Sequence, residues 1–464
     1  MSNGIMNLAF ENEDGEVVTV AEVVGAGDTD VEQGAADPTD FVDAPEVDEV
    51  QAEEQAGEFE ATAGDMDAAA DAAEVLEETA EAVEETIPEG GLSEGAAKAI
   101  EVSVESLLLK VGFSAKHAKA LPAMEGFKDA GTRAAKTKLA VESFKEKAIA
   151  LWRAIVAAFQ KAVEHVKNFL DLSGRQAAGL AKRADELAKK SASLKGAAKI
   201  KEISGEKLLS ADGKLLSGSN LVSAYKKHAS QIAGQENRIA RLNGVVEDVK
   251  KAMEGGSVDT DPMKFFGVGK DGKIAQNPSF TIADNQKAFE MEFALGGKSL
   301  FTILPVANDE AKAGGAIKFL ASLRGAHAKI ADATDAKKVE GGKVAVLDPR
   351  EIGDLCKEVA AHMKTYEGLT KAVSEAKSAA NKLAQEVSKF SREGADDAAK
   401  DEASAKAKAV SAAINAATNV LMGGAIALRK FDIAVAKASL TQAAKSVRAY
   451  EGKAEEPAAE PAAA

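Results

Sequence analysis

Residues 143–170 read SFKEKAIALWRAIVAAFQKAVEHVKNFL, and their apolar residues recur at every third or fourth position. This spacing places one stripe along a single helix face, formed by Phe144, Ala148, Trp152, Ile155, Phe159, Val163, Val166 and Leu170. Ser143 and Glu146 fit a capping box, in which each side chain satisfies a free backbone amide at the helix start. The stretch therefore predicts an amphipathic core helix about 42 Å long that begins at Ser143.

The charge changes sign along the chain. Residues 1–97 contain 29 Asp and Glu and no Lys or Arg, whereas the remainder contains 45 acidic and 58 basic residues. The two parts should attract each other. Such a split is typical of an acidic tail on a basic body and often concerns nucleic acid. The simpler alternative is a solvated acidic linker that adds only solubility.

The fold class we predict is mainly α-helical with a small antiparallel β-sheet insertion, preceded by a disordered acidic leader. Residues 1–92 lack an apolar period long enough to bury a face, so they predict disorder, with at most a transient helix over 69–87. The segments that follow are a leader end and processing boundary at 93–142, a helical body at 143–254, a mixed region with the sheet at 255–348, a helical region at 349–452 and a low-complexity tail at 453–464.

Further helices and strands follow from the same periodicities. The predicted helices span about 93–111, 174–200, 220–253, 309–323, 350–371, 373–391, 395–422 and 424–450. Gly423 and Gly424 separate the last two, which we expect to form a helical hairpin. The predicted strands are 279–282, 288–295, 299–306 and 343–347, with Gly296–Gly297 and Asp212–Gly213 as tight turns.

No residue pattern in the sequence indicates catalysis or metal binding. Gly267, Gly272 and Lys273 satisfy most of a phosphate-binding loop, but Ile274 stands where the motif needs Ser or Thr. The five histidines show no metal-ligand spacing, and Cys356, the only cysteine, indicates a small core residue. We therefore expect a protein that is not an enzyme, with no catalytic residue, no cofactor and no metal.

Two triads of a small residue, any residue and Glu lie near the change in charge. They are Ala123-Met124-Glu125 and Ala140-Val141-Glu142. Ala-x-Glu recurs elsewhere in this chain, so it is their position that marks them. A cut after Glu142 would release an acidic segment and leave 50 basic and 40 acidic residues, beginning at the predicted start of the long helix.

The succession ALPAMEGF, AAKTKLAVESF and ALWRAIVAAFQKAVEHVKNFL resembles the internal head proteins of giant and other large tailed bacteriophages, most clearly over residues 92–172. The resemblance implies a virion protein packed inside the capsid, and in the host cytoplasm during assembly. It implies an N-terminal propeptide that a prohead protease removes by cutting after Glu125, Glu142 or both. The implied partners are the prohead protease, capsid or core proteins and packaged DNA, with no small-molecule substrate and no membrane.

Electrostatics is consistent with that resemblance. A basic body gains affinity for DNA through phosphate contacts that do not depend on sequence, and an acidic leader would mask that surface until it is removed. A net charge of +10 after a cut at Glu142 predicts weak binding.

Three other functions remain open at this point. The first is an uncleaved acidic-tail protein, such as a DNA mimic or a histone-type chaperone. The second is an ejected membrane-active effector that uses residues 143–170 as a helix lying on the bilayer surface. The third is an enzyme with its site in the sheet region.

Overall fold

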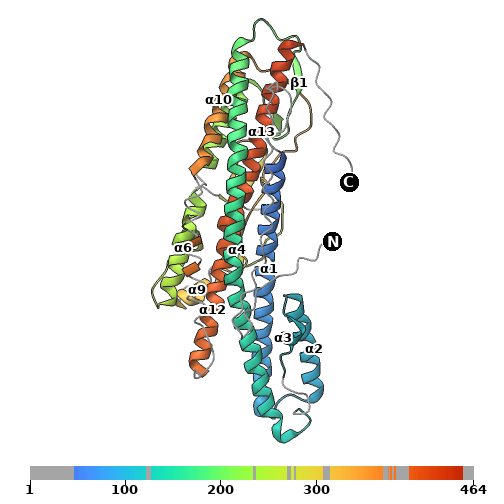
Figure 1. The fold of residues 1–464 in the computed structure, drawn as a ribbon, viewed down its shortest axis with the longest axis vertical. Helices are drawn as coiled ribbons and strands as arrows, with labels where there is room; N and C mark the ends of the chain where they lie inside the picture. Colours follow the sequence, from blue (N-terminus) through green and yellow to red (C-terminus); the bar gives the residue numbers. More distant parts are fainter. Residues whose placement is uncertain are drawn as a thin grey trace, which may run out of the picture.

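The computed structural model describes residues 46–121, 127–233, 237–268, 273–275, 278–306, 314–368, 375, 377–378, 381–382 and 397–452. A single helix, α4 (Ala130–Ser193), runs along most of the molecule's length (Figure 1). Its first turn is capped by Asp129, whose side chain accepts a hydrogen bond from the Gly131 amide. Along its inner face Phe144, Trp152 and Phe159 are all buried.

The predicted amphipathic helix at 143–170 is confirmed, but both of its predicted ends were wrong. Residues 130–142 are rich in Ala and Lys, which are strong helix formers, so the helix does not need the Ser143 cap and begins thirteen residues earlier. At the other end α4 continues through Gly174, so the separate helix predicted at 174–200 is part of α4 and ends at Ser193. The predicted domain boundary at residue 143 therefore falls inside a continuous helix.

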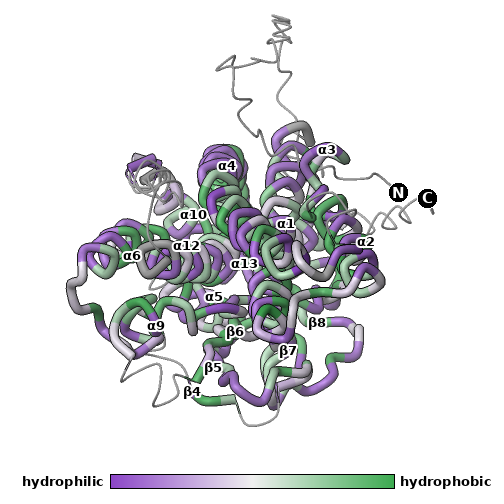
Figure 2. Tube along the Cα trace, turned by 90° about the horizontal axis from the view of Figure 1, so that it is seen from below, coloured by the Kyte–Doolittle hydropathy of each residue, from purple (hydrophilic) through white to green (hydrophobic). Residues whose placement is uncertain are grey.

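The helix α1 (Glu46–Glu84) lies beside α4 for most of its own length (Figures 1 and 2). The prediction of a disordered leader was wrong for residues 46–92, while residues 1–45 lie outside the described residues. The buried face of α1 is a stripe made mostly of alanines at spacings of three and four. Small side chains on such a stripe let two helix backbones approach closely, which buries area without long apolar residues.

After α1 the chain turns through the 3-10 helix η1 (Ile87–Glu89) into α2 (Glu94–Lys110) and α3 (Ala115–Ala118). The predicted helix at 93–111 is confirmed, and its N-cap Ser93 accepts a hydrogen bond from the Ala96 amide. The amide of Leu92 donates to Thr137 Oγ1 at 2.9 Å, which fastens this turn to α4.

Among the described residues, the rest of the helical layer comprises seven α-helices, a 3-10 helix and a π-helix. They are α5 (Gly218–Ala233), α6 (Asn237–Met253), α7 (Pro262–Phe266), α9 (Gly315–Ser322), α10 (Pro349–Lys364), the 3-10 helix η3 (Thr365–Gly368), α12 (Asp397–Ala417), the π-helix η4 (Thr418–Met422) and α13 (Gly423–Glu451). The helix predicted at 373–391 lies almost wholly outside the described residues.

The predicted helical hairpin at Gly423–Gly424 was wrong, because α12, η4 and α13 form one continuous helical rod. Gly423 has helical backbone angles, with φ −58° and ψ −42°. A Cβ on Gly424 would lie 3.1 Å from the Ala328 Cβ, so this glycine allows close packing on the sheet and makes no turn. The rod is long and apolar enough to cross a bilayer, but 83% of its most apolar window is buried inside the protein, as in a core helix.

In the part of the chain that the structure describes, three small antiparallel sheets complete the fold. The largest has the order β4 (Lys273–Ile274), β5 (Gln286–Glu292), β6 (Lys298–Pro305) and β7 (His327–Asp332). The second is a hairpin of β2 (Ser210–Ala211) and β3 (Lys214–Leu215). In the third, β1 (Glu202–Ser204) pairs with β8 (Lys343–Ala345), far apart in sequence.

Both predicted tight turns are confirmed. Gly296 and Gly297 join β5 to β6 with φ of 80° and 59°, and Asp212 and Gly213 join β2 to β3 with φ of 51° and 80°. The strand predicted at 279–282 was wrong, since these residues form no ladder, and the strand predicted at 343–347 belongs to a different sheet from β5 and β6. The fold class, mainly helical with a small antiparallel sheet, is confirmed.

The two layers meet along α13. Viewed along the long axis, α13 lies between α4 on one side and the four-stranded sheet on the other (Figure 2). The largest core cluster extends from α1 through α4 to α6, α9 and α12, and a second cluster joins the end of α4 to α5, α10 and α13.

Candidate functional site

Ion pairs hold the acidic helix α1 to the basic part of the chain along its whole length. The helix contains 15 Asp and Glu and no Lys or Arg. Its carboxylates pair with cations of α4, α12, α13 and the turn before β7: Asp48 with Arg175, Glu49 with Lys437, Glu53 with Lys430, Asp71 and Glu74 with Arg324, Glu74 and Glu77 with Lys408, and Glu84 with Lys145. The attraction expected from the charge split is therefore realised within one chain. We call the surface that α1 packs against, which carries these cations and Trp152, the α1-contact surface.

Glu77 is the polar centre of this contact. Its Oε1 accepts hydrogen bonds from Trp152 Nε1 at 3.2 Å and from Ser404 Oγ at 3.0 Å, while its Oε2 lies 3.2 Å from Lys408 Nζ. Trp152 is 1% exposed, and its own carbonyl accepts a hydrogen bond from Ser411. One carboxylate thus ties α1 to α4 and α12 at a single point.

A second specific contact involves Asp67. Its two carboxylate oxygens accept hydrogen bonds from Asn415 and Asn419, near the junction of α12 and η4. Burial raises the pKa of Asp67, although the hydrogen bond from Asn415 opposes this shift. Contacts of defined geometry such as these specify one register of α1, which a diffuse charge attraction does not.

The first small-x-Glu triad, Ala123-Met124-Glu125, lies outside the described residues. It stands in the connection between the end of α3 at Ala118 and the start of α4 at Ala130. On either side of it the chain is anchored, because Ala120 is 4% exposed and Phe127 is fully buried. Whether this triad is cut stays a prediction.

The second triad, Ala140-Val141-Glu142, lies inside α4, and the structure does not bring it near the start of a helix. Ala140 is fully buried and Val141 is 2% exposed. Proteases bind substrates in an extended form, so cutting here requires several turns of α4 to open. The structure thus describes only the second predicted triad, and it places that triad in a buried stretch of helix.

The label of β1 and the helix α10 lie toward one end of the molecule in Figure 1. Exposed basic residues are concentrated in the segments that form the last turns of α4, the β1–β8 and β2–β3 pairs and the start of α10. Over residues 182–215 and 333–357, five Asp and Glu are exposed against twelve Lys and Arg. We call these twelve the basic end: Lys182, Lys189, Lys195, Lys199, Lys201, Lys207, Lys214, Lys337, Lys338, Lys343, Arg350 and Lys357. Because Asp48 near the start of α1 pairs with Arg175, the last 18 residues of α4, about 27 Å, extend beyond that contact.

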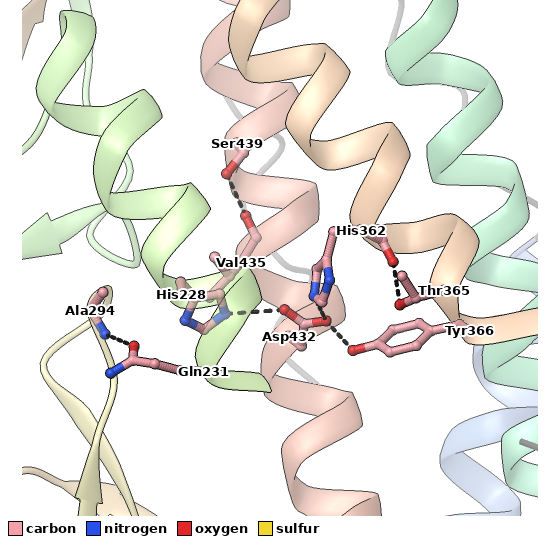
Figure 3. A network of polar contacts seen from close by, with 9 residues as sticks. All are labelled: His228, Gln231, Ala294, His362, Thr365, Tyr366, Asp432, Val435 and Ser439. Atoms are coloured by element: carbon pink, nitrogen blue, oxygen red, sulfur yellow. Dashed lines mark hydrogen bonds and ion pairs between the residues drawn. The ribbon is translucent and has the colours of Figure 1, made fainter. Parts of the chain in front are cut away.

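A buried polar network joins α5, α10 and α13 (Figure 3). Asp432, fully buried, accepts hydrogen bonds from His228 Nε2 at 3.1 Å, His362 Nε2 at 2.9 Å and the Tyr366 hydroxyl. Burial alone would raise the pKa of Asp432, but the hydrogen bonds and charge of the two histidines outweigh it and hold this pKa below its ordinary value. Both carboxylate oxygens of Asp432 are engaged within the network, while His228 Nδ1 is buried without a hydrogen-bond partner among the described residues.

Other reactive groups of the described residues are also engaged or shielded. Burial raises the pKa of the Cys356 thiol to about 12, so the thiol stays protonated. Glu290 lines a cleft of about 740 Å³ at the sheet edge. Its carboxylate accepts hydrogen bonds from Thr334 and Ser299. Within the described part of the chain, no cluster of His, Cys, Asp and Glu is arranged to hold a metal ion.

Sequence reasoning missed Glu77 and Asp432, the two carboxylates that organise the described contacts. The stripe of alanines in residues 52–83 was the available signal for the first, since its spacing of three and four is helical. Nothing local marks Asp432, because its partners come from two other helices.

Comparison with known proteins gives one match. A family model described as phiKZ-like phage internal head proteins matches residues 48–445, which includes α1 and reaches into α13. No curated protein and no solved structure matches the chain.

Proposed function

The chain belongs to the phiKZ-like phage internal head proteins, and from this membership we propose that it is made as a precursor whose acidic N-terminal part is cut off at Glu125. As an internal head protein it is a structural protein located inside the phage capsid. The cut, and a contact with packaged DNA argued below, are our proposals beyond this family assignment.

The observation that carries the choice of Glu125 is the burial of the other triad. Ala140 and Val141 are buried in α4, so a cut after Glu142 would require that helix to open. The first triad falls, in sequence, after the end of α3 at Ala118 and before the start of α4 at Ala130. The body that follows the cut, residues 126–464, contains 54 basic and 42 acidic residues.

N-terminal sequencing and intact mass of the protein from its native particle test the cut. A chain that starts at Gly126 is the expected result, and a chain that starts at Ser143 would assign the cut to the second triad. An intact mass that shows only the full-length chain, starting at Met1 or Ser2, would overturn the propeptide. Coexpression of the prohead protease with two matched variants gives a second test of the cut. Glu125→Gln should block the cut and Glu142→Gln should leave it unchanged.

We propose in addition that the basic end faces the packaged DNA. Phosphate contacts by exposed Lys and Arg give affinity without reading sequence, as a protein among densely packed DNA requires. Residues 1–45, with eleven Asp and Glu and no Lys or Arg, directly precede α1 and would compete with DNA for this surface. The acidic segment would then weaken DNA binding for as long as it lies beside the basic end.

Duplex DNA binding at several salt concentrations tests this surface in the full chain. Reversing Lys195, Lys201 and Lys338 to Glu should weaken binding at low salt and lower the salt slope by about two to three. The matched control reverses the exposed Lys251, Lys264 and Lys318, which lie on α6, α7 and α9. Equal losses in the two variants would refute a role for the basic end.

The membrane-effector alternative requires the apolar face of residues 143–170 to be free. In this structure Phe144, Trp152 and Phe159 on that face are buried in the core. While α1 is docked, that face is not available to a bilayer.

A further inference from the structure

We infer that cutting the connection after α3 does not release the leader: α1 stays bound to the α1-contact surface as a separate chain, so the processed protein is a two-chain complex. This inference rests on the proposed function only for the position of the natural cut. The α1-contact surface fits an acidic, alanine-rich amphipathic helix, and the helix that occupies it is residues 46–84 of this chain.

The first reason is that α1 is part of the main hydrophobic core. Twelve of its apolar residues are at most 7% exposed, and all belong to the same core cluster as Phe144, Trp152 and Phe159 of α4: Ala52, Ala56, Phe59, Ala63, Met66, Ala69, Ala70, Ala72, Ala73, Leu76, Ala80 and Val83. Departure of α1 would return both faces to water. Apolar burial on this scale is the chief source of stability within a fold and between subunits alike.

The second reason is the polar pairing within that contact. If α1 left, Trp152 Nε1 would lose its acceptor at Glu77, and Asn415 would lose Asp67. Departure would exchange each of these hydrogen bonds for one to water, so they add only a modest net gain, but their geometry fixes the register in which α1 docks.

The third reason is that the short helices between α1 and the cut are also fastened to α4. The Leu92 amide donates to Thr137 Oγ1, and Lys147 Nζ donates to the His117 carbonyl. The family match also starts at residue 48, so it treats α1 as part of the shared protein. Cutting removes a tether, and thus lowers the effective concentration of α1, but it leaves every one of these contacts in place.

The test uses the full chain with the recognition sequence of a site-specific protease inserted between Glu125 and Gly126. After cutting, the two fragments are analysed by size-exclusion chromatography and native mass spectrometry in about 0.15 M and about 1 M NaCl, where the screening length falls from about 8 Å to about 3 Å. We expect them to coelute in both and to separate only in denaturant. Separation in either salt would overturn the inference, since the buried apolar contact is not screened by salt.

Two matched variants locate the cause. Ala56→Asp places a carboxylate on the buried face of α1 and should release the cut leader, whereas Ala61→Asp, on the exposed face, should not. Retention of the Ala56→Asp leader would contradict the argument. If the Ala56→Asp chain does not fold, hydrogen exchange of the cut wild-type protein decides: the amides of α1 should keep the protection they have before the cut, and loss of that protection would overturn the proposal.

Because the cut is engineered, the coelution result does not depend on whether the protein is naturally cut at Glu125. Native protein found only as the uncut full-length chain would refute the proposed processing, yet the coelution experiment would still show whether the α1-contact surface retains a separate helix. Conversely, release of the leader after the engineered cut would leave processing at Glu125 intact and refute only the two-chain complex.

Discussion

The indole Nε1 of Trp152 donates a 3.2 Å hydrogen bond to the carboxylate of Glu77, so the only tryptophan of the chain touches the acidic helix at its polar centre. The contact joins residues 75 positions apart, one from the acidic segment and one from the basic body. It makes the fluorescence of Trp152 a direct reporter of whether α1 is docked.

Substituting Glu77→Gln should lower the free energy of unfolding by about 1–3 kcal/mol. The amide keeps one acceptor but loses the charge that faces Lys408 and that strengthens the bond from Trp152. Urea unfolding followed by tryptophan fluorescence measures the change. Glu81→Gln is the control, because Glu81 is exposed on the same helix, and a loss of equal size there would contradict a specific role for Glu77.

Substituting Asp432→Asn should lower the free energy of unfolding by about 3–5 kcal/mol near neutral pH, because it breaks a buried, hydrogen-bonded charged group. The folded pKa of Asp432 is depressed, so its stabilisation is complete above the unfolded pKa of about 3.9 and is lost as pH falls through the lower folded pKa. The gap between wild type and variant should therefore narrow only below pH about 4. Denaturant unfolding of both proteins at several pH values measures this difference in free energy of unfolding. A difference that disappeared between pH 5 and 7 would contradict the prediction.

Substituting Gly423→Pro should destabilise the protein by about 3 kcal/mol or more. Its amide donates to the Thr418 carbonyl within the continuous rod, and proline would remove that bond and clash with the preceding turn. Thermal or urea unfolding measures the effect, which a turn between two hairpin helices would not show. Gly64→Ala is a control with the opposite expected sign. Gly64 lies on the exposed face of α1, and outside its own helix backbone no atom lies within 4 Å of the added Cβ, so we expect the free energy of unfolding to rise by about 0.5–1 kcal/mol.

The Cys356 thiol should not react with a disulfide reagent at pH about 8 until the protein unfolds. The side chain is fully buried and burial raises its pKa to about 12, so the reactive thiolate is scarce and inaccessible. Measuring thiol reactivity against urea concentration should give a transition that coincides with unfolding. Rapid modification of the native protein would show that the second core cluster opens locally.

Elements with a strong local signal could be predicted from the sequence. The stripe from Phe144 to Leu170 is helical in the structure, and the pairs Gly296–Gly297 and Asp212–Gly213 form the expected turns because their positive φ suits few other residues. The candidate cleavage triads could be located from charge and spacing, but not ranked. Their ranking depends on whether each lies in a connection or in a buried helix.

Elements decided by partners could not be predicted. Residues 46–84 have too few large apolar side chains to fold alone, and their charges repel one another, so local reasoning assigns disorder. In the folded chain, alanines at every third or fourth position pack against α4, and the carboxylates meet cations from four distant segments. Likewise Gly423–Gly424 is locally typical of a helix break, yet both glycines lie within the continuous rod, and Gly424 packs closely against Ala328.

The sequence by itself thus determined the helical class, the tight turns and the division into an acidic and a basic part, because propensity, periodicity and charge are properties of neighbouring residues. Only the tertiary structure decided that α1 is a member of the core, that the second triad is buried and that Asp432 is held by two histidines. Each of these depends on contacts between residues far apart in the chain, and the free energy of burial and pairing becomes available only once those segments meet.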